Sequence, residues 1–260
     1  GKFGLGFKSV FLLSDQPTVK SGRLAFTVKG GVYPVTPDEM HVKKMRAYLD
    51  RVVAPELQDA TLTELPLLDQ EVAEATFDHF SNLAPFALAF TRALRQLHLR
   101  RGQVSRHHWW KEQAVAPGIT VMTLQGGSED WHGLALHSPD FKLLLPLGAR
   151  GFGKLDSDVP NLWVTAPTAE KLGLPFLLHA AFPLDTGRAQ LARSEAGLTE
   201  LVEQLRPALQ TALEHLLDLE RGGELKSRLG WPAKAKVDLP TALWQVLALP
   251  LGREDSNPAF

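Results

Sequence analysis

"GITVMTLQ" (residues 118–125) is one of four short stretches that decide the fold of this chain; the others are "QLHLRR" (96–101), "HGLALHS" (132–138) and "KLLLPL" (142–147). Alternating or concentrated apolar residues between glycine- and proline-containing turns are typical of sheet strands. "NLWVTAP" (161–167) and "PFLLHAAFPL" (175–184) predict two further strands, which flank a turn or short helix at Thr168–Leu172. The centre of the chain is therefore expected to form a β-sheet.

Helical patterns lie on both sides of this strand-rich region. The most regular helix is expected over 197–220, another over 38–50, and a third from Glu71 to about Leu97, divided by Pro85. Behind Pro85 an apolar stripe is interpreted as core packing, and it consists of Phe86, Phe90, Leu94 and Leu97. The apolar residues of 197–220 lie on one side of the expected helix: Leu198, Leu201, Val202, Leu205, Leu209, Leu213 and Leu216.

The beginning of the chain predicts a helix followed by a hairpin. Apolar residues recur at helical spacing over 3–14, and "SDQPT" (14–18) ends this pattern because Pro17 cannot continue a helix. "TVKSG" and "RLAFTVKG" then predict two strands around a turn at Ser21–Gly22. Glycines and prolines over 30–37 are expected to close this first unit.

The order of helix, hairpin, helices, strands and long helix predicts an α+β fold in two units. We expect the first unit over residues 1–36, a connector over 37–70 and a second α+β domain over 71–220. Residues 221–260 are expected to form a C-terminal extension.

Composition narrows the classes of function only slightly. The formal net charge of −1 over 260 residues gives no bulk attraction to nucleic acid or anionic lipid, although a local basic patch is compatible with it. Cysteine is absent, which excludes disulfides and thiolate sites and fits a reducing compartment. With no membrane-length apolar run and no secretory signal, a cytoplasmic location is expected. Because the chain does not begin with Met, we expect its natural start upstream.

The first seven residues, "GKFGLGF", carry a glycine motif that fits neither of the common phosphate-binding patterns. Gly1, Gly4 and Gly6 give G-x-x-G-x-G rather than the dinucleotide fingerprint, and Gly6-Phe7-Lys8-Ser9 has one residue too many for a P-loop. Glycines before a helix start allow backbone N–H groups to approach a phosphate closely. The spacing alone leaves open a phosphate site or a tight turn packed under a helix.

The longer string "GKFGLGFKSVFLLSDQPTVKSG" (1–22) resembles the lid-to-helix segment of the GHKL ATPases, the Bergerat-fold group that includes heat-shock chaperones and histidine kinases. The likeness is closest to the chaperone-like branch that contains sacsin, and it covers some twenty consecutive positions without a gap. The resemblance implies that residues 1–36 are the C-terminal part of a Bergerat-type α/β sandwich, and that the domain after the connector is a transducer-like middle domain.

The resemblance also implies an ATP-phosphate site in the glycine stretch. Its backbone N–H groups would surround the β- and γ-phosphates, and the following helix would point its positive end at them. Lys2 and Lys8 are either phosphate partners or surface lysines, Phe3 and Phe7 fix the turn by packing, and Ser9 either bonds near the phosphates or simply continues the helix. The implied binding residues are Gly1, Lys2, Phe3, Gly4, Leu5, Gly6, Phe7, Lys8 and Ser9.

A second segment, "LWVTAPTAEKLGLPFLLHAAFPLDTGRAQL" (162–191), resembles the next module of the same branch. In the heat-shock chaperones an arginine in the matching turn reaches the γ-phosphate, which makes Arg188 the catalytic candidate. An arginine there stabilises charge in the transition state. A structural loop arginine, paired with Asp185, is the alternative. The chaperones also place a Gln four residues later, where this chain has Ala192.

Motifs that precede the lid in GHKL ATPases are absent from this sequence: the helix whose Glu activates water and whose Asn holds Mg²⁺, and the D-x-G-x-G for adenine. We therefore expect the chain to be part of a chaperone-like ATPase that binds ATP and Mg²⁺ in its full-length form. Its partner would be a protein client or a nucleic-acid machine of the defence type. A non-catalytic chaperone-like scaffold is the alternative function.

One basic and aromatic stretch stands apart from these motifs. "RRGQVSRHHWWK" (100–111) is compatible with nucleic-acid or peptide contact, but a hairpin with one Trp buried is the favoured interpretation. His107 and His108 are adjacent, and adjacent residues on a strand point to opposite faces. They are therefore not expected to chelate one metal ion.

Overall fold

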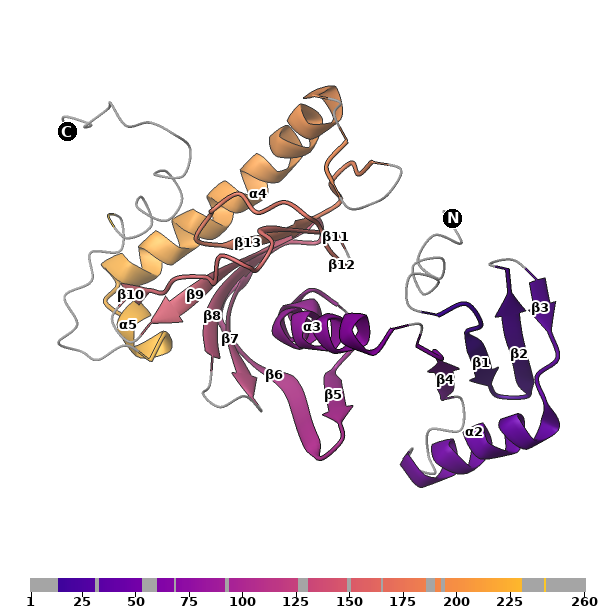
Figure 1. The fold of residues 1–260 in the computed structure, drawn as a ribbon. Helices are drawn as coiled ribbons and strands as arrows, with labels where there is room; N and C mark the ends of the chain where they lie inside the picture. Colours follow the sequence, from indigo (N-terminus) through magenta and orange to yellow (C-terminus); the bar gives the residue numbers. More distant parts are fainter. Residues whose placement is uncertain are drawn as a thin grey trace. The chain divides into compact units, whose positions relative to one another are not determined.

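The computed structural model describes residues 14–30, 33–52, 60–67, 69–91, 94–125, 131–148, 151–164, 166–185, 190–192, 195–230 and 241. The chain divides into two compact units, Gly1–Phe80 and Ser81–Phe260, and the boundary falls inside helix α3 (Figure 1). Both units contain helices and antiparallel strands, so the predicted α+β class is confirmed.

The first unit contains a four-stranded antiparallel sheet in the order β3-β2-β1-β4. Ser21 pairs with Leu24, so the two-residue turn begins at Gly22, whose φ of 50° lies in the left-handed region that glycine adopts readily. The predicted hairpin is thereby confirmed. The strands are β1 (Thr18–Ser21), β2 (Leu24–Lys29), β3 (Tyr33–Val35) and β4 (Thr61–Glu64).

Helix α2 (Glu39–Val52) confirms the helix predicted over 38–50. Asp38 begins it, because its Oδ1 accepts hydrogen bonds from the backbone N–H groups of Met40 at 2.9 Å and His41 at 3.1 Å. Such a cap satisfies donors that have no partner within the helix. Met45 is the buried residue of α2, so the helix is mainly solvent-facing.

Two predictions for this unit differ from the structure. The sequence predicted that residues 30–37 end the first unit. Tyr33–Val35 instead form the edge strand β3, where the missing N–H of Pro34 is tolerated. The 37–70 segment, expected to be a connector, contains α2 and also β4, which pairs with β1 along its whole length. Pairing with a strand distant in sequence places this segment in the first unit.

Helix α3 (Gln70–Phe90) runs without a break through Pro85, where the sequence predicted a division. It also ends at Phe90 rather than near Leu97, which lies in β5. The residues from Ser81 to Phe90 are mainly buried, whereas those from Gln70 to Phe80 are mainly exposed. The apolar stripe is thus confirmed for Phe86 and Phe90, but Leu94 is exposed beyond the helix end.

The second unit is built on a nine-stranded sheet, and the strands predicted from Gln96 to Leu147 are confirmed. They form a meander of neighbouring antiparallel strands: β5 (Gln96–Arg101), β6 (Val104–Ala116), β7 (Ile119–Gln125), β8 (Trp131–His137) and β9 (Phe141–Gly148). Next to β9 lies β13 (Leu177–Ala180), then β11 (Leu162–Val164) parallel to it and β12 (Ala166–Pro167), while β10 (Gly151–Phe152) pairs with the end of β9.

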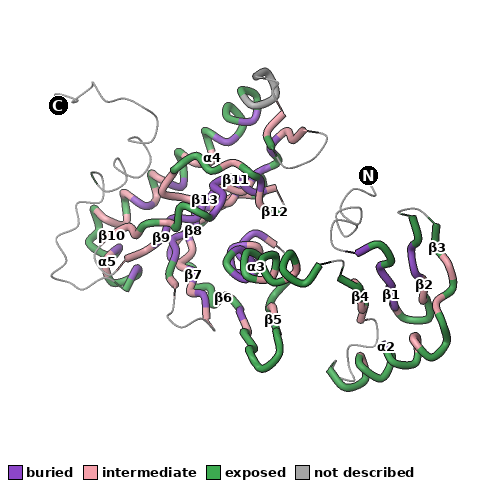
Figure 2. Tube along the Cα trace, viewed as in Figure 1, coloured by how far each residue is buried: buried purple, intermediate pink, exposed green. Residues whose placement is uncertain are grey.

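Both faces of this sheet are buried at its centre, and a helix covers each (Figures 1 and 2). On one face α4 (Glu195–Arg221) and α5 (Leu225–Arg228) pack against apolar side chains such as Leu134 and Leu136. On the other face the buried half of α3 packs against residues such as Leu144 and Trp163. Alternation of side chains along each strand produces these two cores.

Helix α4 confirms the helix predicted over 197–220, and most of the predicted stripe packs against the sheet. Val202 is an exception, with 49% of its surface exposed. Leu225 and Leu229 join the same core, so the start of the expected C-terminal extension belongs to the second unit. Within the described ranges, no helix combines the length and the apolar character needed to cross a membrane.

The turn between β6 and β7 gives a stability test with a matched control. Gly118 lies in this turn, and the control, Gly102, lies in the turn between β5 and β6. Both have left-handed φ angles, 70° for Gly118 and 56° for Gly102. A Cβ at Gly118 would lie 2.9 Å from the backbone oxygen of His137, whereas one at Gly102 would meet nothing within 4 Å. Gly102→Ala should cost about 1–2 kcal/mol for backbone strain. Gly118→Ala should cost about 2–5 kcal/mol, because overpacking adds to the strain.

Urea unfolding of the 260-residue chain, followed by far-UV circular dichroism, measures both costs. Equal free energies of unfolding for the two variants would contradict the close approach of the β6–β7 turn to β8.

Candidate functional site

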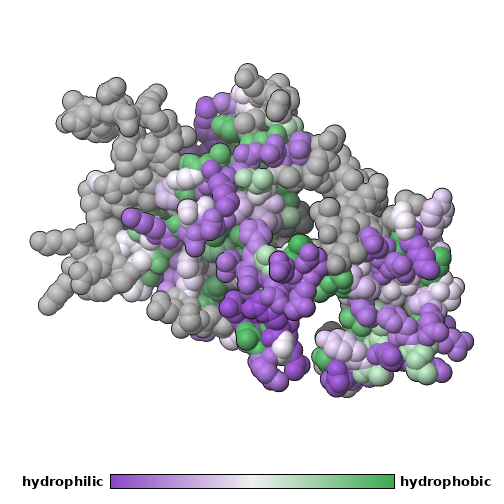
Figure 3. Space-filling model, viewed as in Figure 1, coloured by the Kyte–Doolittle hydropathy of each residue, from purple (hydrophilic) through white to green (hydrophobic). Residues whose placement is uncertain are grey.

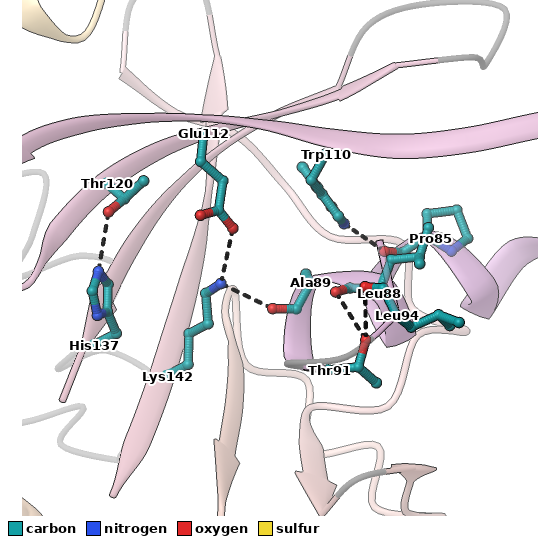
Figure 4. A network of polar contacts seen from close by, with 10 residues as sticks. All are labelled: Pro85, Leu88, Ala89, Thr91, Leu94, Trp110, Glu112, Thr120, His137 and Lys142. Atoms are coloured by element: carbon teal, nitrogen blue, oxygen red, sulfur yellow. Dashed lines mark hydrogen bonds and ion pairs between the residues drawn. The ribbon is translucent and has the colours of Figure 1, made fainter. Parts of the chain in front are cut away.

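The second unit contains a cavity of about 200 Å³ where α3 ends against the sheet. Residues from α3, β6, β7, β8, β9 and β13 line it, and Figure 4 draws five of its polar side chains, those of Thr91, Glu112, Thr120, His137 and Lys142. Its ionisable side chains are Glu112, His137, Lys142 and His179, and Thr91, Thr120 and Ser138 add hydroxyl groups. Sequence reasoning identified none of them as site residues.

Strand register brings three of these side chains into one row. Lys142 on β9 pairs with His137 on β8 and with His179 on β13, because β9 lies between those strands. Directly opposed residues share a face and have Cβ atoms about 5 Å apart. Leu143, the next residue along β9, faces the opposite core with α4, so the row faces α3.

The Lys142 ammonium closes the C-terminal end of α3. Its Nζ donates a hydrogen bond to the Ala89 carbonyl oxygen at 2.9 Å and lies 3.6 Å from Glu112 Oε1 (Figure 4). The last carbonyls of a helix have no partner within it and carry the negative end of its dipole, so a cation is favourable there. Burial lowers the pKa of Lys142, while the Glu112 carboxylate acts in the opposite direction through its charge and hydrogen bond.

The two imidazoles have separate environments. His137 Nε2 lies 3.0 Å from the Thr120 hydroxyl, and its pKa is lowered by burial first and by the Lys142 charge second. The His179 ring stacks on Phe90, with centroids 5.5 Å apart and an angle of 13° between the planes. Lowered pKa values favour neutral His137 and a more readily deprotonated Lys142 amine.

The size of this cavity limits what it can do. Ligand pockets usually measure roughly 300–1,000 Å³, so about 200 Å³ is too small for a nucleotide. The observed contacts of Lys142 give the row a structural role, which is to hold the end of α3 on the sheet. Among the residues that the structure describes, no three His, Asp or Glu side chains are grouped to hold a metal ion.

The sequence-predicted site residues are not among these side chains. The phosphate-binding candidates Gly1–Ser9 and the catalytic candidate Arg188 all lie outside the described residues. The residues on either side of the Arg188 turn are described. Leu184 and Leu191 form an antiparallel bridge, and Asp185 N–H donates to the Gln190 carbonyl oxygen at 2.9 Å.

A buried asparagine organises the segment that precedes this turn. Asn161 Nδ2 donates to the carbonyl oxygens of Leu174 and Phe176 at 2.7 and 2.9 Å, and its Oδ1 accepts from Leu172 N–H at 2.8 Å. Glu170 in the same segment accepts a hydrogen bond from Leu191 N–H at 3.0 Å. These bonds attach the loop before β13 to the base of the Arg188 turn.

The basic and aromatic hairpin of β5 and β6 is confirmed, but its tryptophans differ from expectation. Trp109 is exposed, and Trp110 is only half-buried, with its Nε1 donating to the Pro85 carbonyl oxygen at 2.7 Å. His107 and His108 lie on opposite faces. His107 stacks on His98, whereas His108 is buried and neither of its ring nitrogens has a hydrogen-bond partner.

No protein-family model matches this chain, and no curated protein matches it either. The assignment to the GHKL ATPases therefore stays a prediction that rests on residues 1–22 and 162–191.

His108 predicts a pH dependence of stability. Burial, followed by the charges of Arg106 and His107, lowers its pKa from 6.5. The unfolded chain then binds more protons than the folded chain as the pH falls below about 6.5, so stability decreases there. The free energy of unfolding should be smaller at about pH 5.5 than at about pH 7.5, and His108→Leu should weaken this dependence because it removes one titrating group.

Urea titrations at the two pH values compare the variants, and His132→Leu, at an exposed position of β8, is the control. An unchanged pH dependence in His108→Leu would show that the buried imidazole does not titrate differently on unfolding.

Lys142 predicts a linked titration. The midpoint of its ammonium should lie below the ordinary value of 10.5, and Glu112→Gln should lower it further because the carboxylate favours the charged amine. NMR of lysine Cε signals measures the midpoint, with Lys142→Arg identifying the signal. A midpoint that stays constant or rises in Glu112→Gln would contradict the described pairing.

Proposed function

We propose that this chain is part of an ATP-binding and ATP-hydrolysing protein of the chaperone-like GHKL group. The observation that carries the proposal is the string of residues 1–22, with its three glycines, its apolar helical pattern and its closing S-G turn. In this proposal Gly1–Ser9 surround the β- and γ-phosphates of ATP with backbone N–H groups. Arg188 stabilises charge on the γ-phosphate.

The first unit supports this proposal through its hairpin. The turn begins at Gly22, at the position of the S-G turn in the resembling string, and the β1 residues just before it are buried. A lid that leads into buried sheet structure has a rigid base, which phosphate binding by backbone N–H groups requires. We assign the first unit, whose sheet includes β4, on this basis to the end of a Bergerat-type sandwich and the second unit to a transducer-like domain.

The second unit supports the role of Arg188 through the residues beside it. The Leu184–Leu191 bridge and the Glu170–Leu191 hydrogen bond attach both ends of the turn to ordered structure. An arginine that acts on a phosphate must be held in position, because catalysis depends on preorganised charge. The cavity at α3 is too small for ATP, which favours a nucleotide site elsewhere in the protein.

ATP and Mg²⁺ would bind in the full-length protein, where a Glu would activate water and an Asn would hold the metal. Binding and hydrolysis of ATP would then drive a conformational change that acts on a protein client or on nucleic acid. ATP binding without turnover would instead favour the chaperone-like scaffold.

Arg188→Ala in the full-length protein tests the catalytic role. Steady-state ATP turnover should fall by roughly 100-fold or more, whereas the Kd for ATP should change by less than about 3-fold, because the arginine acts mainly on the transition state. Arg206→Ala, at an exposed position of α4, is the matched control and should leave both unchanged.

Turnover in Arg188→Ala equal to that of the parent protein would remove Arg188 from the mechanism. Absence of both ATP binding and turnover in the parent protein would overturn the proposed function.

A further inference from the structure

One face of the β5–β6 hairpin is left open by the helices of the second unit. Cross-strand pairing places Gln96 opposite Trp109, His98 opposite His107, and Arg100 opposite Ser105. Of these six residues, only His107 is half-buried, and the others are exposed. We call them the open hairpin face. The opposite face carries Leu99 and His108, which are buried.

Three aromatic rings form a continuous row on the open hairpin face. The rings of His98 and His107 stack with centroids 3.7 Å apart and planes 12° apart. His107 and Trp109 follow at 4.6 Å and 36°. His107 Nε2 lies 2.9 Å from Gln96 Oε1, which fixes the orientation of the central ring. Trp109 leaves 37% of its surface exposed at one end of the row.

The surroundings of this row are basic. Residues 94–111 contain no Asp or Glu, although the whole chain has a formal net charge of −1. The space-filling view shows a mainly hydrophilic surface over the β5–β6 hairpin (Figure 3), and its turn is exposed (Figure 2). The basic residues of this segment are all exposed. Arg100 lies on the open hairpin face and Lys111 continues it, whereas strand alternation places Arg101 and Arg106 on the opposite face.

Strand alternation extends the polar surface beyond the hairpin. Lys111 shares the face of Trp109 and pairs with Thr123 on β7, which in turn pairs with His132 on β8. Thr123 Oγ1 lies 3.1 Å from His132 Nδ1. The row of rings is therefore bordered by a cation and by uncharged polar groups rather than by an apolar patch. This composition disfavours an apolar helix or a lipid surface as the partner.

We propose that the open hairpin face binds single-stranded nucleic acid. Unpaired bases would stack on the exposed ends of the His98–His107–Trp109 row, and the phosphates would pair with Arg100 and Lys111. Stacking on exposed aromatic rings beside cations is how sheet surfaces bind single strands without sequence preference. In a duplex the base faces are already stacked on each other, so only the charges would contribute.

The pKa of His107 agrees with this use of the ring. Desolvation and, next, the charge of neighbouring His98 lower that pKa, which keeps the central imidazole neutral at neutral pH. A neutral ring can remain stacked between its neighbours without repulsion from His98. This proposal rests on residues other than those of the proposed ATP site and does not depend on that site.

Fluorescence anisotropy with labelled oligothymidine and oligouridine of about 15 nucleotides tests the proposal on the 260-residue chain. Binding should be detected at low salt for at least one of the two single strands, and more weakly for a duplex of equal length. Trp109→Ala should weaken binding by about 10-fold or more, while Trp109→Phe should retain most of it. Arg100→Gln should reduce the slope of log K against log salt by about 1.

Arg46→Gln, an exposed arginine on α2, is the charge control and should change neither affinity nor slope. Far-UV circular dichroism of each variant confirms that the fold is retained. Absence of binding, equal affinity for duplex and single strands, or full affinity in a folded Trp109→Ala variant would each overturn the proposal. Equally effective competition by polyglutamate would also overturn it, in favour of an acidic protein partner.

Discussion

The burial of both faces of one antiparallel sheet is the constraint on which the second unit depends. On β8 four consecutive residues from Gly133 to Leu136 are buried, so each face needs its own cover. Helix α4 provides it on one face and the second half of α3 on the other. Because α3 ends against the sheet, its terminal carbonyls need a partner, and Lys142 on β9 supplies it.

The same constraint explains which polar side chains of the sheet are exposed to solvent. Gln113 and Val121 are cross-strand partners, and Val121 packs against the core under α4, whereas Trp109 on the same face of β6 lies beyond this core and is exposed. Polar and aromatic side chains at that end of the sheet are therefore available to a partner. The second unit thus has two polar regions, the row of Lys142 at the end of α3 and the open hairpin face, and the positions at which its helices end determine both.

Local sequence patterns predicted much of the fold. Alternation identified the strands from Gln96 to Leu147, and helical periodicity identified α2 and α4. The continuous course of α3 through Pro85 was not predictable from local sequence. Burial of Phe86 and Phe90 against the sheet outweighs the cost of a proline inside the helix. Edge position likewise explains the unexpected strand at Pro34.

The candidate site divides in the same way. Gly1–Ser9 and Arg188 were identified by the resemblance to the GHKL ATPases, because each lies in a continuous segment of sequence that resembles that family. The row of His137, Lys142 and His179 depends on the pairing of β13 with β9, which are separated by the 28 residues 149–176, and no local pattern specifies that pairing. Asn161 has the same origin, since its partners lie over 172–176.

The ATP proposal and the nucleic-acid proposal use separate residues and are compatible. The sequence left two classes of partner open, a protein client and nucleic acid. The two proposals together would favour nucleic acid. The central claim of the ATP proposal is that residues 1–9 and Arg188 bind the same nucleotide. Hydrogen–deuterium exchange of the full-length protein with and without Mg·ATP measures this most directly. The account predicts slower exchange in peptides covering 1–9 and 184–191 together, and protection of neither segment at a saturating nucleotide concentration would contradict it.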